Sequence, residues 1–413
     1  MGQALAIWLA ETKVALVEQE RGKLRLTYTQ DALDRFPLGS PLLSLSLPLT
    51  PRRYPEGVVR AFLEGLLPEG DARRAVADDF DLLASDTFGL VRTLGRDCAG
   101  ALVIQPDDEQ PPPQPTTMTA DPLNEADVAV LVRNLRSAPL GVSGDVRISL
   151  AGMQEKLLLT RMPDGSWGRP VAGTPSTHIL KPEHASYPNT VENEAFCMRM
   201  AKHLGLPVAG VETTTIGGRR LIVVDRYDRV VLSDGRVARL HQEDFCQALG
   251  IHPKKKYQDG GGPSLQRLGE TLQAATGPDS LEMLLRGLTL NVVIANGDAH
   301  GKNFSLLHTQ AGALELAPFY DLMSTLSYGD NRLAMHVDEV RRTDRVTANR
   351  IVNEATKWGM SRRRASEVVE DLLARARDAA EAARQETEDV PASVLETVEW
   401  QLARIANSLS KAT

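Results

Sequence analysis

The hydrophobic and polar positions of the first fifty residues alternate in short segments. Apolar side chains take every second position in Lys23–Tyr28 and again in Leu43–Leu47, and a period of two predicts half-buried strands. Between Val58 and Leu67 the apolar residues instead recur at helical spacing, which predicts a short helix. The chain is therefore expected to open with a β-rich unit.

A proline-rich stretch ends this unit. Prolines occupy positions 111, 112, 113 and 115. Proline fits neither a helix interior nor a central strand, because it lacks the backbone N–H. We therefore expect an exposed linker at residues 109–122, after a β-rich N-terminal subdomain at residues 1–108.

Strands and one helix alternate after the linker, before the chain becomes helical. The pattern predicts a hairpin at Ile148–Arg161, and strands at Ser176–Lys181 and Gly218–Asp225 on either side of a helix at Thr190–Leu204. From about Gln242 onward the apolar spacing is mostly helical. A β-rich half followed by a helical half is typical of the α+β class.

The length and composition fit a globular protein of several domains. The 413 residues exceed one small core and favour two or three domains. The hydrophobic share of 42% is ordinary for such a protein, and no apolar run is long enough for a membrane span. The short apolar stretch at the start lacks a basic flank and soon carries Glu11 and Lys13, so we expect no signal peptide.

The cysteines and the net charge exclude further classes of protein. The three cysteines, Cys98, Cys197 and Cys246, are far apart, so the sequence predicts neither a disulfide framework nor a zinc site. A reducing cytoplasm is the compartment that fits. The formal net charge of −7 argues against nucleic-acid binding by the chain as a whole.

The strongest chemical signal is a polar loop followed by a predicted hairpin. Asp298 and Asn303 begin and end the string Asp-Ala-His-Gly-Lys-Asn, and Asp321 ends Pro-Phe-Tyr-Asp after the two strands. Phosphoryl transfer needs one carboxylate for the proton of the attacking hydroxyl, and an Asn and a second Asp that hold Mg²⁺. The spacing from Asp298 to Asn303 matches the D-x-x-x-x-N of kinase catalytic loops.

A polar loop whose Asn and Asp cap turns is the structural alternative, and it would be preferred for an isolated D-x-x-x-x-N. The hairpin and the second acidic residue, Asp321, favour the kinase. His300 lies two residues after Asp298 and could contact a phosphate or the substrate, but holding the loop by hydrogen bonds is the simpler role.

A second signal is Lys181, at the end of the apolar strand Thr177–Lys181. In kinases a lysine in such a strand binds the α- and β-phosphates and pairs with a glutamate of the next helix. Glu194 borders the apolar stripe of that helix and is the expected partner, with Glu192 as the rival. The structural alternative is a lysine that protects an edge strand.

A third signal lies one strand before Lys181. Ala151 and Gly152 form an expected turn within the string Arg147-Ile-Ser-Leu-Ala-Gly-Met-Gln-Glu-Lys156. Backbone amides in such a turn can approach phosphates. Because the turn contains only one glycine, it is weak evidence for a phosphate-binding loop. Taken alone, this segment would be interpreted as a simple hairpin turn.

Together these strings resemble the HipA family of bacterial toxin kinases. The resemblance covers nearly the whole chain in the right order, and it includes the N-terminal region. The matching strings are Leu43-Ser-Leu-Ser-Leu-Pro-Leu49, Leu66-Leu-Pro-Glu69, Gly95-Arg-Asp-Cys-Ala-Gly-Ala101, Arg147 to Lys156 as written above, Thr177-His-Ile-Leu-Lys181, Val191-Glu-Asn-Glu194, Gln242-Glu-Asp-Phe-Cys-Gln247, Asp298-Ala-His-Gly-Lys-Asn303 and Pro318-Phe-Tyr-Asp321.

The resemblance implies a protein-kinase-like, two-lobed α+β fold with a β-rich N-terminal subdomain and a mostly helical C-terminal lobe. The kinase N-lobe with its ATP-covering loop would occupy residues 123–240. The helical C-lobe, with the catalytic loop and the metal site, would occupy residues 241–413.

The resemblance also implies a role for each matched residue. Asp298 would be the catalytic base, Glu194 the structural ion-pair partner of Lys181, and Ser149 the autophosphorylation site that switches the kinase off. Asn303 and Asp321 would hold Mg²⁺. The residues that would contact ATP are Ala151, Gly152, Met153, Gln154, Glu155, Lys181, Asp225, Tyr227, His300, Lys302, Asn303 and Asp321. Asp225-Arg-Tyr-Asp228 lies where the nucleotide hinge of the family falls, although the family often has Glu-Arg-Phe-Asp there.

Members of this family are toxins of type II toxin–antitoxin pairs. The resemblance therefore implies a helix-turn-helix antitoxin partner of the HipB type, with operator DNA contacted only through the antitoxin complex. The implied substrate is an aminoacyl-tRNA synthetase, whose phosphorylation would stall translation and promote dormancy and persistence. The implied location is the cytoplasm, without a membrane partner.

Two other functions stay open at this point. One is a catalytically weak, kinase-fold co-repressor that acts with a DNA-binding antitoxin; the intact Asp298, Asn303, Asp321 and Lys181 argue against it. The other is a small-molecule phosphotransferase, because such enzymes also use a D-x-x-x-x-N loop. The matching N-terminal region favours the protein kinase.

Overall fold

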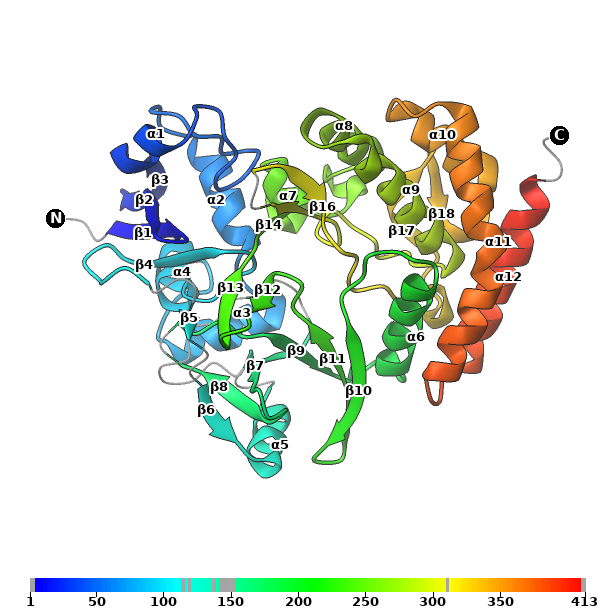
Figure 1. Cartoon of the computed structure of the whole chain (residues 1–413), viewed down its shortest axis with the longest axis horizontal. Helices are drawn as coiled ribbons and strands as arrows, with labels where there is room; N and C mark the ends of the chain where they lie inside the picture. Colours follow the sequence, from blue (N-terminus) through cyan, green and yellow to red (C-terminus); the bar gives the residue numbers. More distant parts are fainter. Residues whose placement is uncertain are drawn as a thin grey trace. The chain divides into compact units, whose positions relative to one another are not determined.

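The computed structural model describes residues 4–112, 116–117, 120–135, 139–140, 150, 154–171, 173–309 and 312–409. The chain forms two compact units (Figure 1). Unit 1 comprises Met1–Pro182 and Thr214–Lys254, and unit 2 comprises Glu183–Thr213 and Lys255–Thr413. The segment Glu183–Thr213 therefore packs with the C-terminal part of the chain, although it lies between two segments of unit 1.

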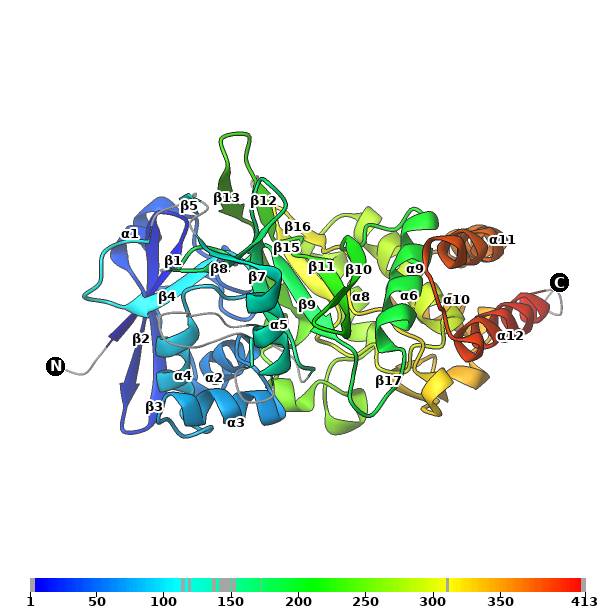
Figure 2. The ribbon, with the colours of Figure 1, turned by 90° about the horizontal axis from the view of Figure 1, so that it is seen from below.

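The first sheet of unit 1 contains the expected N-terminal strands. Its antiparallel strands lie in the order β3-β2-β1-β4; they are β1 (Ala4–Leu9), β2 (Thr12–Glu20), β3 (Lys23–Tyr28) and β4 (Leu102–Pro106). Helices α1 (Gln30–Arg35), α2 (Glu56–Gly65) and α4 (Thr87–Leu94) pack on this sheet (Figures 1 and 2), and α3 (Gly70–Asp79) follows α2 in the chain. Helix α2 confirms the predicted helix at Val58–Leu67. Ile7, Leu26 and Phe62 are fully buried in the shared core.

The strand expected at Leu43–Leu47 is wrong, because this segment forms turns. The Leu47 N–H donates to the Ser44 carbonyl oxygen at 3.0 Å, which closes one turn. The Ser44 hydroxyl donates to the buried carboxylate of Glu243, and the Leu45 N–H donates to its other oxygen at 3.0 Å. The alternation therefore reflects leucines packed in the core and serines that bind distant polar groups, and not a pleated strand.

A second sheet has six strands in the order β10-β11-β9-β7-β8-β6 and belongs to unit 1 apart from the first residues of β10. Its strands are β6 (Ala120–Leu123), β7 (Leu157–Arg161), β8 (Trp167–Pro170), β9 (His178–Pro182), β10 (Val211–Ile216) and β11 (Arg219–Asp225). Helix α5 (Glu125–Arg133) packs Val128 and Val132 into the core of this sheet. Strands β9 and β11 confirm two predicted strands. Strand β7 covers the second half of the hairpin expected at Ile148–Arg161, and nearly all of the first half lies outside the described residues.

Part of the expected linker enters these sheets. Strand β5 (Thr116–Thr117) pairs with β13 (Arg236–Arg239), and β6 pairs with β8. Pro122 is tolerated in β6 because this strand lies at the edge of its sheet. The short elements that complete unit 1 are β12 (Arg229–Val231), β14 (His241–Asp244) and α7 (Phe245–Ala248).

Unit 2 is mostly helical, as the C-terminal pattern predicted. Its helices are α6 (Thr190–His203), α8 (Leu265–Ala275), α9 (Pro278–Val293), α10 (Ala348–Lys357), α11 (Arg362–Glu386) and α12 (Ala392–Leu409). Its hairpins pair β15 (Ser305–His308) with β16 (Leu314–Leu316), and β17 (Arg332–Val337) with β18 (Val340–Arg342). Helices α11 and α12 run side by side (Figures 1 and 2), and α11 also packs on α6, α9 and α10. None of the described helices combines the length and the hydropathy needed to cross a bilayer.

A buried cluster of charges in unit 1 joins Asp97 to the segment after β11. The Asp97 carboxylate accepts hydrogen bonds from the Ser176 N–H and from Arg229 Nη2, both at 2.8 Å, and Arg226 Nη1 lies 3.3 Å away. Burial alone would raise the pKa of this carboxyl, but Arg229 and Arg226 hold the pKa of Asp97 well below its usual range. Arg226 also pairs with Asp228 at 2.9 Å. The cluster fixes the N-terminal subdomain to the residues just before β9 and just after β11.

We expect Asp97→Ala to lower the free energy of unfolding by about 3–5 kcal/mol, because the change removes one of the two carboxylates that the buried Arg226 and Arg229 share. The matched control is Asp107→Ala, which removes an ion pair with Lys13 between partly exposed side chains and should cost about 1 kcal/mol or less. Urea unfolding followed by circular dichroism measures both variants. Small, equal losses would show that the buried cluster does not stabilise unit 1.

Candidate active site

Helix α9 leads into the predicted catalytic loop. The helix begins with Pro278 after Gly277, where the missing proline N–H costs nothing because the first turn has no acceptor for it. After the helix, Ala295 takes a φ of +53° and turns the chain. The residues Asn296–Asn303 that follow form the loop predicted to be catalytic, which is called the catalytic loop below.

The first half of the catalytic loop forms no helix or strand, and hydrogen bonds to side chains hold it in place. The Asp298 N–H donates to Asn296 Oδ1 at 3.1 Å, and the Gly297 N–H donates to Thr325 Oγ1 at 2.7 Å. A Cβ at Gly297 would lie 2.2 Å from the Arg332 carbonyl oxygen, so a larger residue would displace the loop. These contacts determine where the Asp298 side chain lies.

The Asp298 carboxylate is partly desolvated by its neighbours, and the residue remains exposed to solvent. Its Oδ1 accepts a hydrogen bond from the Tyr257 hydroxyl at 2.9 Å. Burial raises the pKa of Asp298 to about 6; the Asp321 carboxylate also raises it, while Tyr257 and Lys256 lower it in part. A carboxylate with this pKa is mostly ionised at pH 7 and can still accept a proton, so Asp298 suits the predicted role of base.

His300 and Lys302 are buried members of the catalytic loop. Burial lowers the pKa of His300 to about 3, with help from Lys256, so the ring is neutral at pH 7. Its Nδ1 accepts the Lys302 N–H at 3.3 Å, and the Lys302 carbonyl oxygen accepts the Tyr320 hydroxyl at 2.6 Å. Both residues therefore help to hold the loop, and their contact with ATP stays a prediction.

The β15–β16 hairpin brings Asn303 back beside Asp321. Asn303 Nδ2 donates to Asp321 Oδ2 at 2.9 Å, while Asn303 Oδ1 accepts the His300 N–H at 3.2 Å. Asp321 has a φ of +58°, a left-handed conformation that costs energy for a residue with a side chain and is frequent at functional sites. The preceding Phe319 packs so closely on Gly287 of α9 that a Cβ there would lie 2.2 Å from the ring.

Asn303 and Asp321 fit a magnesium site of the kinase type. An amide oxygen and a carboxylate are the hard oxygen ligands that Mg²⁺ prefers, and phosphates and water supply the others in kinases. The Asn303 amide would have to turn over, because its NH₂ group now faces Asp321 and cannot bind a cation. Among the described residues, no three His, Cys, Asp or Glu side chains gather to hold a metal, so a metal here would also need ligands from the nucleotide.

The segment after Asp321 is fixed by helix α6. Asn193 Nδ2 donates to the Ser324 carbonyl oxygen at 3.0 Å, and the Ser324 N–H donates to Asn193 Oδ1 at 2.9 Å. The sequence analysis considered Glu192 and Glu194 but missed Asn193 between them. Asn193 is fully buried, and a buried amide requires polar partners. Its position among the apolar residues of the helix was the sequence feature that could have indicated such partners.

The residues predicted for the nucleotide phosphates fall into different units. Lys181 is buried on β9 of unit 1, whereas Glu192 and Glu194 are both buried on α6 of unit 2. The pairing of Lys181 with either glutamate therefore stays a prediction.

The predicted ATP-covering loop is described only at its end. Ser149, Ala151, Gly152 and Met153 lie outside the described residues. Gln154 and Glu155 follow them, and a Glu155 carboxylate oxygen lies 3.6 Å from Arg219 Nη2.

The predicted nucleotide hinge alternates between buried and more exposed side chains. Arg226 and Asp228 belong to the buried cluster around Asp97. Asp225 instead accepts from His178 Nε2 at 3.1 Å, an interaction that lowers the pKa of its carboxyl, and the Tyr227 hydroxyl donates to a carbonyl oxygen of the Gln242 side chain at 2.6 Å. Asp225 and Tyr227 are thus the hinge side chains that could reach a ligand.

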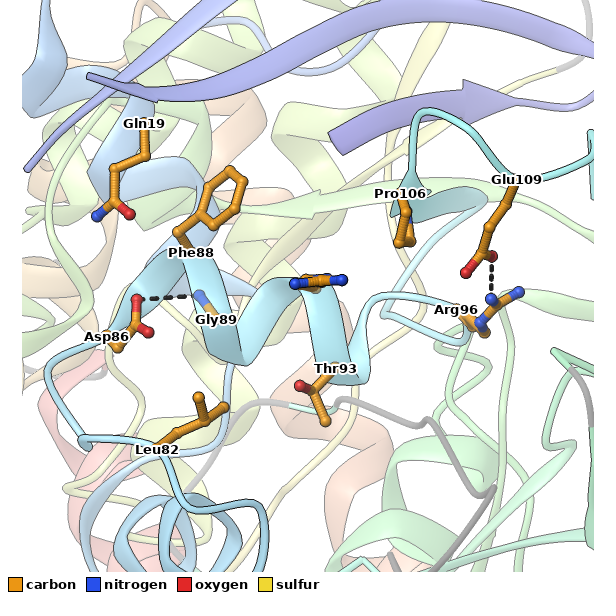
Figure 3. Close-up of a pocket in the computed structure, with 10 residues that line it drawn as sticks. Gln19, Leu82, Asp86, Phe88, Gly89, Thr93, Arg96, Pro106 and Glu109 are labelled. Carbon is orange, nitrogen blue, oxygen red and sulfur yellow. Dashed lines mark hydrogen bonds and ion pairs between the residues drawn. The ribbon is translucent and has the colours of Figure 1, made fainter. Parts of the chain in front are cut away.

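A pocket of about 600 Å³ in unit 1 contains none of the predicted site residues (Figure 3). It lies beside α4, and its lining includes Gln19, Asp86, Phe88, Arg92, Arg96 and Glu109. Asp86 caps α4 by accepting the Gly89 N–H at 3.0 Å, and Arg96 pairs with Glu109. Because these charges are already satisfied within the protein, they do not define a second active site.

The comparisons with known proteins cover both parts of the chain. The HipA N-terminal domain matches residues 5–105, and the HipA-like C-terminal domain matches residues 148–380. The Y4mE protein of Sinorhizobium fredii is 40% identical over 81% of this chain and 81% of its own length. The serine/threonine-protein kinase toxin HipA of Shewanella oneidensis is 33% identical over 68% of this chain and 67% of its own length.

A solved structure extends this likeness to the fold. The structure of the Shewanella oneidensis HipA, HipB and operator DNA complex contains a chain with a TM-score of 0.83 and 27% identity, which covers 98% of this chain and 97% of that one. The α+β fold of this structure and the kinases among its relatives define a kinase-like protein. The chain belongs to the HipA family.

We expect kinase activity to fall as the pH drops through about 6, because Asp298 with a pKa of about 6 must be ionised to accept the proton of the acceptor hydroxyl. The dependence of kcat/KM on pH measures this, and circular dichroism at each pH shows whether the protein stays folded. A flat profile between pH 5 and pH 7.5, in roughly the range where such a base titrates, would exclude Asp298 as the base.

Proposed function

We propose that this protein is an ATP- and Mg²⁺-dependent serine/threonine kinase and the toxin of a type II toxin–antitoxin pair. The observation that carries the proposal is the contact between Asn303 and Asp321, beside a base candidate, Asp298, whose pKa suits proton transfer. Membership of the HipA family supports the same reaction.

Four residues of unit 2 have defined tasks in this proposal. Asp298 accepts the proton of the acceptor hydroxyl while the hydroxyl oxygen attacks the γ-phosphorus of ATP. Asn303 and Asp321 hold Mg²⁺, which supplies positive charge to the phosphates. Neutral His300 keeps the loop between them in place. In unit 1, Lys181 binds the α- and β-phosphates, and the loop at Ala151–Glu155 covers the nucleotide.

We propose a helix-turn-helix antitoxin of the HipB type as the partner, with operator DNA bound through the antitoxin complex. The solved relative is a complex of HipA, HipB and operator DNA, which supports this partner. The proposed substrate is an aminoacyl-tRNA synthetase, whose phosphorylation in the cytoplasm would stall translation and lead to persistence. The resemblance of the chain to this family of toxins supports that choice.

The test is transfer of labelled phosphate from ATP to a panel of purified aminoacyl-tRNA synthetases. We expect the wild-type protein with Mg²⁺ to label at least one synthetase. The variant Asp298→Asn should lose about 100-fold or more of this activity, because it removes the general base, and should keep its circular dichroism spectrum. A folded Asp298→Asn protein that transfers phosphate at the wild-type rate would refute the assignment of the base.

We expect Ser149 to become phosphorylated by the kinase itself, and this modification to inactivate it. A phosphate adds about two negative charges at pH 7, which would repel the phosphates of ATP or draw the covering loop away from them. The variant Ser149→Ala should keep its activity on the substrate and lose the gradual self-inactivation seen in Mg-ATP. Mass spectrometry should find the phosphate in the wild type and not in Asp298→Asn. Wild-type protein that stays unmodified at Ser149, or is modified and still binds ATP, would contradict the switch.

A further inference from the structure

A loop to which the sequence assigned no function lies against the catalytic loop of unit 2. This tyrosine loop comprises Lys255–Pro263. The Lys256 carbonyl oxygen accepts the Gly301 N–H at 3.2 Å, and the Tyr257 carbonyl oxygen accepts the Gly262 N–H at 3.0 Å. A Cβ at Gly262 would lie 2.6 Å from that same carbonyl oxygen, so this close turn requires glycine. The two loops are therefore joined through their backbones.

The side chain of Tyr257 is fixed by three contacts. Its hydroxyl donates to Asp298 Oδ1 at 2.9 Å. The ring meets the His300 ring edge to face, with centroids 5.2 Å apart and planes at 82°, and Lys256 Nζ lies 5.7 Å from the ring centroid. The side chain keeps 39% of its surface exposed. Tyr257 thus contacts Asp298 while remaining open to solvent, the side from which an acceptor would approach Asp298.

The hydrogen bond from Tyr257 occupies one oxygen of the Asp298 carboxylate. Within the part of the chain that the structure describes, the other oxygen, Oδ2, makes no hydrogen bond, and Asp298 is exposed to solvent. We infer that Tyr257 is a positioning residue for phosphoryl transfer, which holds Oδ1 so that Oδ2 is presented to the acceptor hydroxyl. This inference rests on the proposed function and adds to it the group that orients the base.

The proposed step conserves atoms and charge. The oxygen of the acceptor hydroxyl forms a bond to the γ-phosphorus, and the bond from that phosphorus to the bridging oxygen of ADP breaks. The hydroxyl proton moves to Asp298 Oδ2, while Tyr257 keeps its own proton throughout. A base that is held in one orientation avoids the loss of rate that follows from a misplaced catalytic group.

An opposite role for Tyr257 would be to block the base, because its hydroxyl makes the hydrogen bond that an acceptor hydroxyl could make. The carboxylate has a second oxygen for the acceptor, and the backbone contacts of the tyrosine loop hold the phenol at Oδ1. The geometry therefore favours positioning, and the two roles predict opposite effects when the hydroxyl is removed.

The test compares Tyr257→Phe and Tyr257→Ala in the full chain. Two probes accept the phosphate: glutamyl-tRNA synthetase, and the kinase itself through self-phosphorylation. We expect kcat to fall by about 10- to 100-fold in both variants, because both lose the hydrogen bond to the base, and KM for Mg-ATP to stay at the wild-type value. The matched control is Tyr187→Phe, which removes the hydroxyl of another exposed tyrosine of unit 2 and should leave both constants unchanged.

Each outcome has a defined meaning. A wild-type kcat in Tyr257→Phe together with a low kcat in Tyr257→Ala would mean that the ring contacts matter and not the hydrogen bond, and would overturn the inference. A raised kcat in Tyr257→Phe would show that the hydroxyl blocks the base, and would overturn it as well. If the wild-type protein labels neither probe nor any other synthetase, the proposed function fails, and the inference fails with it.

Discussion

The hydrogen bond between the Asn303 amide and the Asp321 carboxylate is the interaction on which the proposed site depends. It joins the end of the catalytic loop to the end of the β15–β16 hairpin, so that two polar residues distant in sequence become neighbours. The rest of the local structure supports this contact: Phe319 packs on Gly287 of α9, and Asn193 of α6 fixes Ser324 just beyond Asp321. Helix α9 therefore positions the site through the close approach of Phe319 to Gly287, and helix α6 positions it through the Asn193 side chain.

Contacts between residues distant in sequence also fix the N-terminal subdomain. Asp97 binds the Ser176 N–H just before β9 and the guanidinium groups of Arg226 and Arg229 after β11. These two strands carry Lys181 and Asp225, both predicted to contact the nucleotide. The N-terminal subdomain, which contains no predicted catalytic residue, thus contacts the residues next to both strands that are predicted to bind the nucleotide.

Local patterns in the sequence predicted the elements whose side chains pack on one face. The apolar spacing in α2 and α6 and the alternation in β3 predicted these elements, and the motif Asp298 to Asn303 predicted a loop that the structure places beside Asp321. The alternation at Leu43–Leu47 led to a wrong strand prediction, because the segment forms turns and the Ser44 hydroxyl donates a hydrogen bond to the distant Glu243. Asn193, Tyr257 and the partners of Asp97 were missed because their contacts join residues far apart in the chain, and such contacts leave no periodic signal.

The account claims above all that Asp298, Asn303 and Asp321 form one phosphoryl-transfer site. A crystal structure of the protein with Mn²⁺ and a non-hydrolysable ATP analogue tests this most directly, because the anomalous signal of manganese locates the metal. The account predicts a metal bound by an Asp321 carboxylate oxygen and the Asn303 amide oxygen, with the γ-phosphate facing Asp298. A metal and nucleotide bound away from Asn303 and Asp321 would contradict it.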